Sequence, residues 1–182
     1  MRLARVRALI IIGTLALVAT ATAAWAIMND SQADLAGCEP GEVPVNLAMP
    51  KPQDVEVRVF NSTKEPGLAG QVKADLQEYG YKVVETDDKE VEGLTTSARI
   101  VYGPKSLGAG HVLSAYFLDA ERQFVPDRDD TTIDVIIGDG FRQVNTESEK
   151  VQSLGEIGRP TAPPGTCEIG KGTEVTPQTS AS

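Results

Sequence analysis

The sequence predicts a small mixed α/β domain, an α+β sandwich in which two helices cover one face of a four-stranded sheet. Four short segments alternate apolar and polar residues, as strands with one exposed face do, and two longer segments carry their apolar residues along one side of a helix. Their order along the chain is strand, helix, strand, strand, helix, strand. This βαββαβ order favours a ferredoxin-like arrangement, which we expect an N-terminal transmembrane helix to precede.

The first strand is the segment VEVRVF, which begins at Val55 and alternates apolar with charged residues. A polar turn, NSTKEPG, follows this strand. The first helix then begins at Leu68 and ends before Gly80, because glycine is typical of the position after a helix C-terminus. Its apolar positions form one stripe: Leu68, Val72, Leu76 and Tyr79.

The second half of the domain repeats this pattern. A strand begins at Tyr81, an acidic loop covers residues 86–96, and ARIVY at residues 98–102 is the third strand. The apolar side of the second helix consists of Leu107, Val112, Leu113, Tyr116 and Phe117. The segment DAERQFVPDRDD, residues 119–130, is expected to be a mobile loop, and TIDVIIG at residues 132–138 is the last strand.

An apolar run near the N-terminus predicts a membrane anchor. No residue from Ala8 to Asn29 is charged, and residues 9–28 are long enough to cross a bilayer as a helix. Three arginines precede the run, so we expect residues 1–8 in the cytoplasm and the rest of the chain outside it, at the plasma membrane. The alternative is a signal peptide that is cleaved at the small-x-small pattern of residues 24–26, which would give a secreted protein.

The segments on either side of the domain have a different composition. Residues 29–53 are rich in proline and are expected to form an extended extracytoplasmic linker. Residues 146–182 are predicted to be mostly disordered, because few of their side chains are large and apolar beyond Arg159. The α/β domain is therefore assigned to residues 54–145. Cys38 and Cys167 flank it, and a pair of cysteines in an exported chain favours a disulfide over two unpaired thiols.

Four motifs in order carry a family resemblance: VEVRVFNSTKEPGLAG, GYKVV, ARIVYGP and IDVIIGDGF. Over residues 54–141 this set resembles the C-terminal domain of the LytR-CpsA-Psr family of cell-wall proteins. Full-length members also have a large catalytic domain that transfers glycopolymers to peptidoglycan, and the segment before Val55 is too short to hold one. The chain is thus similar to the stand-alone, membrane-anchored form found in actinobacteria, which implies work in the cell envelope without transferase chemistry.

The residues themselves show no pattern of catalytic or metal-binding groups, so we expect no enzyme activity, no cofactor and no metal site. The single histidine, His111, is expected to be partly exposed on the second helix. The aspartates of residues 127–134 lack the ligand register of an EF-hand and indicate a solvated acidic loop. A net charge of −9 makes nucleic acid an unfavourable partner.

The turn after the first strand is the candidate ligand-binding site, formed by Asn61, Ser62, Thr63, Lys64 and Gly67. It leads Gly67 into a helix start, where unpaired N–H groups can hold an anion such as a phosphate or a muramyl carboxylate. The alternative is a structural turn that binds nothing.

Two functions follow from the resemblance. The first is a non-catalytic accessory module, attached to the membrane by its N-terminal helix, that binds or regulates an envelope protein of cell-wall assembly. The second is a domain that binds peptidoglycan or a wall glycopolymer.

Overall fold

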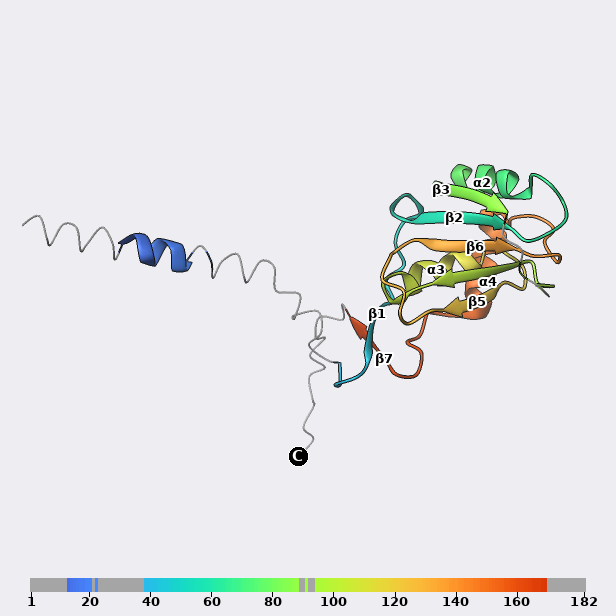
Figure 1. Ribbon diagram of the computed structural model, residues 1–182. Coiled ribbons are helices and arrows are strands. Elements are labelled where there is room, and N and C mark those ends of the chain that lie inside the picture. Colours follow the sequence, from blue (N-terminus) through green and yellow to red (C-terminus); the bar gives the residue numbers. More distant parts are fainter. Residues whose placement is uncertain (1–12, 21, 23–37, 89–90, 92–93, 170–182) are drawn as a thin grey trace, which may run out of the picture. The chain divides into compact units, whose positions relative to one another are not determined.

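The computed structural model describes residues 13–20, 22, 38–88, 91 and 94–169 of the chain (Figure 1). They belong to two units, Met1–Ala36 and Gly37–Ser182. In the first unit residues 13–20 are helical. The described part of the chain contains no helix with both the length and the apolar character needed to span a bilayer. The predicted anchor, residues 9–28, lies partly outside the described residues.

The second unit is built on a five-stranded sheet with the strand order β3-β2-β6-β4-β5 (Figure 1). The strands are β2 (Glu56–Asn61), β3 (Lys82–Asp88), β4 (Ala98–Tyr102), β5 (Glu121–Phe124) and β6 (Ile133–Ile137). β2 pairs in parallel with both β3 and β6, β4 runs antiparallel to β6, and β5 pairs in parallel with β4. The mixed α/β class predicted from the sequence is confirmed.

The strand pairing corrects the predicted ferredoxin-like arrangement. In that fold a further strand separates the two strands that a helix connects. Here α2 (Leu68–Glu78) connects β2 to β3, which are direct neighbours. In the same way α3 (Leu107–Ser114) lies between β4 and β5, which also pair side by side. The chain therefore forms two compact βαβ units that meet at β6.

Strand β5 lies inside the segment that the sequence predicted to be a loop. Of its four residues, ERQF, only the last is apolar, and the first three are exposed. Such a strand has no alternating signal, because it lies at the edge of the sheet and buries little. It forms because β4 offers it a complete row of backbone partners.

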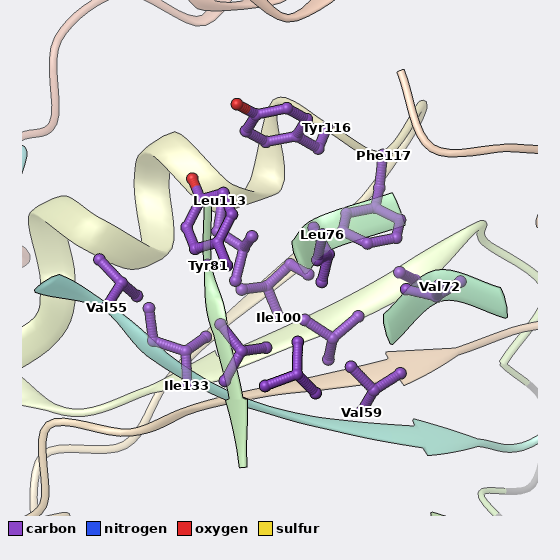
Figure 2. Close-up of a cluster of buried hydrophobic side chains, with 14 of the residues drawn as sticks. Val55, Val59, Val72, Leu76, Tyr81, Ile100, Leu113, Tyr116, Phe117 and Ile133 are labelled. Atoms are coloured by element: carbon purple, nitrogen blue, oxygen red, sulfur yellow. The ribbon is translucent and has the colours of Figure 1, made fainter. Parts of the chain in front are cut away.

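The core fills the space between α2, α3 and one face of the sheet (Figure 2). Successive strand residues point to opposite faces, so Val57 and Val59 of β2 point into the core with Ile133 and Val135 of β6. From α2, Val72 and Leu76 are fully buried. The ring of Tyr116 stacks on Tyr79 with centroids 5.1 Å apart and meets the edge of Tyr81 at 5.7 Å. This packing fixes the positions of the loops at both ends of the strands.

We call residues 54–141 the sheet domain. The elements before and after it form what we call the strap. It comprises β1 (Val43–Asn46), α4 (Glu147–Ile157) and β7 (Thr166–Ile169). β1 and β7 pair in parallel as a separate two-stranded sheet. Cys38 and Cys167 form the predicted disulfide, with their Cα atoms 5.4 Å apart.

The strap differs from the predicted linker and disordered tail. Val45 of β1 is fully buried in the core, although it lies in the segment predicted to be an extended linker. Helix α4 and β7 lie within residues 146–182, where the sequence predicted mostly disorder. Contacts outside the apolar core support this order: the disulfide, the β1–β7 pairing, a capping box at Thr146 and Glu149, and a hydrogen bond from Tyr116 to Glu147. Residues 170–182 lie outside the described residues.

Candidate functional site

The predicted site lies at the sheet edge where parallel strands end. Asn61 is the last residue of β2, Asp88 is the last residue of β3, and Asp139 follows β6. Because the three strands are parallel, their carboxyl ends meet at one edge, which is where open α/β sheets commonly bind ligands. A pocket of about 390 Å³ is formed there, lined by Asn61, Ser62, Thr63, Lys64, Glu65, Pro66, Asp88 and Asp139.

Asn61 holds the turn in shape from inside. Its side chain is 4% exposed, and Oδ1 accepts hydrogen bonds from the backbone N–H and the hydroxyl of Thr63, at 3.0 and 2.9 Å. Its Nδ2 donates to the carbonyl of Glu65 at 2.8 Å. These bonds occupy both ends of the amide, as in the Asx-turns that asparagine favours. Asn61 therefore shapes the turn.

Ser62 also has partners within the protein. Its backbone N–H donates to the carbonyl of Ile137 at 3.0 Å, and its hydroxyl oxygen accepts from the backbone N–H of Val91 at 2.8 Å. The same hydroxyl lies 3.3 Å from the Val91 carbonyl, to which it donates. Ser62 thus connects the end of β2 to β6 and to the acidic loop after β3.

Gly67 precedes α2 in a left-handed conformation, with φ of 85°, which favours glycine. Among the described residues, no side chain caps this helix N-terminus. A second pocket of about 280 Å³ adjoins it, and Lys64, Leu68 and Arg142 are among its lining residues. Thr63, Lys64 and Leu68 at the start of α2 therefore line one pocket.

The charge around the turn does not suit an anion. Lys64 is exposed, and three carboxylates, Glu65, Asp88 and Asp139, line the same pocket. Sequence reasoning missed Asp88 and Asp139, because only the strand pairing brings them to the turn. A phosphate or a carboxylate would be repelled by this set, whereas a neutral ligand rich in hydroxyl groups could use the carboxylates as hydrogen-bond acceptors.

His111 lies away from this site and is 3% exposed, which corrects the prediction of a partly exposed residue. Its Nδ1 is 2.7 Å from Nη1 of Arg122, and its Nε2 is 2.9 Å from the carbonyl oxygen of Gly158. Because a guanidinium group can only donate, Nδ1 accepts from Arg122 and the proton is on Nε2, which donates to Gly158. Burial lowers the pKa of His111, and the nearby positive charge of Arg122 lowers this pKa further.

The prediction of a solvated acidic loop before β6 is confirmed for Asp127, Asp129 and Asp130, which are exposed, but not for Asp134. Asp134 is 8% exposed and contacts Arg58 at 2.7 Å and Arg128 at 3.0 Å. Arg128 also contacts Asp130 at 2.9 Å. Asp129 is paired with Lys105 at 2.6 Å. The last three of these aspartates have protein cations as partners, which the sequence could not show because Arg58 lies on another strand.

The face of the sheet opposite the helices forms a second candidate surface. Arg58 and Phe60 of β2 lie on it, since Val57 and Val59 point into the core. The strand register places Ile136 beside Phe60 and also beside Arg99. We call Arg58, Phe60, Arg99, Val101 and Ile136 the open face. The register also places Asp134 of β6 on this face between Arg58 and Val101, and Arg58 and Arg99 are paired with Asp134 and Glu121. Phe60 and Val101 are half-buried, and Ile136 is buried.

Comparisons with known proteins agree with this fold. Residues 54–141 match the model of a family described as LytR cell envelope-related transcriptional attenuator. A crystal structure of the soluble domain of a conserved hypothetical secreted protein from Mycobacterium marinum is similar, with a TM-score of 0.51 and 18% sequence identity. The match covers 63% of this chain and 82% of that one. No curated protein matches this chain.

Proposed function

The domain formed by residues 54–141 belongs to the LytR C-terminal family, and from this premise we propose that the protein is a non-catalytic accessory module of the cell envelope. In this proposal it binds or regulates a protein of cell-wall assembly. A membrane anchor at residues 9–28 would hold the domain on the outer side of the plasma membrane. Release by signal cleavage is the alternative. The Cys38–Cys167 disulfide supports a location of the domain outside the cytoplasm, because disulfides persist in oxidising compartments.

The open face is the observation that carries the proposal of a protein partner. It combines the half-buried side chains of Phe60 and Val101 with two arginines, Arg58 and Arg99. Protein interfaces are enriched in aromatic residues and arginine, and their charged residues lie at the rim. The two helices of the domain pack on the other face of the sheet.

A crosslinking experiment in cells tests this proposal. A photoreactive residue is placed at Gln123, which is exposed and pairs with Val101 across the open face. The matched control carries it at Ala74, which is exposed on α2 on the opposite side of the domain. We expect a discrete crosslinked envelope protein from Gln123 alone, and its loss when Val101→Arg is added. Equal crosslinking from both positions would contradict the proposal.

The second candidate function is binding of a wall glycan at the turn after β2. The pocket beyond β2, β3 and β6 favours it, and its carboxylates suggest a hydroxyl-rich rather than an anionic part of the polymer. The test is sedimentation of the full-length protein with isolated sacculi, with and without attached polymers. We expect Lys64→Ala and Asp139→Asn to weaken binding.

Two further variants make this experiment specific. Lys51→Glu changes an exposed lysine outside the pocket and serves as the control. Asn61→Ala is unsuitable as a binding probe, because the buried amide holds the turn together. Binding that responds to Lys51→Glu as strongly as to Lys64→Ala would show nonspecific attraction and would remove this candidate.

A further inference from the structure

A third pocket lies where the end of α4 meets α3, β4 and β5, apart from both surfaces described above. It has a volume of about 280 Å³. Two cations line it, Arg122 from β5 and Arg159 from the segment after α4, together with the hydroxyl-bearing Thr161. No carboxylate is among its described lining residues. Four other pockets of the described chain each include at least one aspartate or glutamate.

Both arginines lack a carboxylate partner within the described residues. Arg122 makes its hydrogen bond through Nη1 to His111 Nδ1, which leaves most of its five N–H donors for a ligand. Arg159 has no ion pair or hydrogen bond with any described residue. In a chain with a net charge of −9, two guanidinium groups in one pocket without an acidic partner are unusual.

His111 positions both sides of the pocket. Its Nδ1 accepts from Arg122, and its Nε2 donates to the carbonyl of Gly158, the residue directly before Arg159. One buried imidazole therefore fixes the side chain of the first arginine and the backbone beside the second. Groups that are held in place before binding lose less entropy when a ligand arrives.

We propose that this pocket binds an oxyanion, the phosphate or carboxylate group of a ligand, through Arg122 and Arg159. Guanidinium groups match both anions, because their parallel N–H groups donate to two oxygens at once. The side chains of Leu107, Ile157 and Pro163 form an apolar wall beside them, which suits a ligand whose charged group is attached to a less polar body. This site is independent of the turn after β2 and of the open face.

Titration calorimetry of the full-length chain in an uncharged detergent tests the proposal, with inorganic phosphate and acetate as separate probes. We expect saturable binding of at least one probe in the millimolar range. Arg122→Gln and Arg159→Gln should each weaken it about tenfold or more, since each removes charge-assisted hydrogen bonds. Binding of phosphate alone assigns a phosphate-bearing ligand, and binding of acetate alone assigns a carboxylate. Lys64→Ala should change nothing, which separates this result from failure of the wall-binding candidate.

The matched control is Arg142→Gln, which removes the same charge from a pocket that also contains Glu65 and Asp139. Protection of arginine from phenylglyoxal, mapped by mass spectrometry, gives a second readout that does not depend on the variants. The bound probe should protect Arg122 and Arg159 but not Arg142. Absence of saturable binding by either probe, or equal effects at Arg142, would overturn the proposal.

Discussion

Helices α2 and α4 each have 11 residues, but they are held to the protein in different ways. α2 buries Ala69, Val72 and Leu76, whereas α4 buries none of its side chains. The same contrast separates the sheet domain from the strap. The sheet domain is held by its apolar core, whereas the strap adds only Val45 of β1 to that core and is otherwise held by a disulfide, a short parallel strand pair and a few polar contacts. The two regions should therefore respond to different perturbations.

The largest effect is expected from removing the disulfide by Cys38→Ser with Cys167→Ser. A bridge across a sequence separation of 129 contributes about 5 kcal/mol in the chain-entropy model. Urea unfolding followed by circular dichroism measures this loss. Hydrogen exchange should show β1 and β7 opening first, while β2 and β6 stay protected under native conditions. Equal loss of protection in both regions would mean that they form one cooperative unit.

The next largest effect is expected in the core of the sheet domain. Leu76→Ala removes a fully buried side chain and should lower the free energy of unfolding by about 3 kcal/mol. Val151→Ala on α4, where the side chain is 61% exposed, should change it by less than about 0.5 kcal/mol. Both changes in unfolding free energy are obtained from shifts of the urea midpoint, provided that the dependence of free energy on urea concentration is unchanged. Similar costs at the two positions would remove the contrast between the helices.

A smaller effect is expected at the start of α4. Thr146→Ala removes the capping box, in which Thr146 and Glu149 satisfy each other's backbone N–H groups, and should cost about 1 kcal/mol. Because α4 has no buried side chain, the loss should appear as faster amide exchange within residues 147–157. Ser153→Ala in the same helix is the control and should not accelerate exchange. Faster exchange in α2 as well would show that the two helices are coupled.

The smallest effect is expected from the pH dependence of stability at His111. Its pKa is lowered from 6.5 in the folded protein, chiefly by burial, so the unfolded chain binds the proton more readily. The stabilising contribution is complete above about pH 6.5 and is lost as the pH falls below that value toward the lowered pKa. Arg122 and Arg159, both positive, are near this imidazole, while Tyr102 is neutral in this range.

The measurement is the difference in unfolding free energy between the native chain and His111→Gln at several pH values. This difference removes contributions from other titrating groups. It should decrease as the pH falls from 7 to 5. A difference that does not change with pH would show that His111 titrates equally in both states.

The strands and helices with strong periodicity were predictable, and the pairings between them were not. Alternation in VEVRVF and a stripe from Leu68 to Tyr79 are local signals, so β2 and α2 were found close to their observed bounds. Which strand lies beside β2 depends on contacts between distant segments. For this reason the sequence suggested a ferredoxin-like sheet, in which another strand would separate β2 from β3. In the structure these two strands are direct neighbours.

The candidate sites show the same division. The turn of residues 61–67 is continuous in sequence and could be selected in advance, but Asp88 and Asp139 reach it only through the sheet. His111 was expected to be partly exposed, because it lies beside the apolar stripe of its helix. Its partner Arg122 could not be foreseen, since Arg122 lies on β5, a strand without a sequence signal. Thr146 and Glu149 have the spacing of a capping box, which indicated α4 within the predicted tail.

The parallel pairing of β1 with β7 places the entrance and the exit of the folded unit beside each other. The disulfide joins them there, between Cys38 and Cys167. Tension applied between the chain before Cys38 and the chain after Cys167 passes through the sulfur–sulfur bond. The sheet domain between the two cysteines then carries no mechanical load. While the bond is intact, a protein tethered at one end and pulled at the other keeps its sheet domain folded.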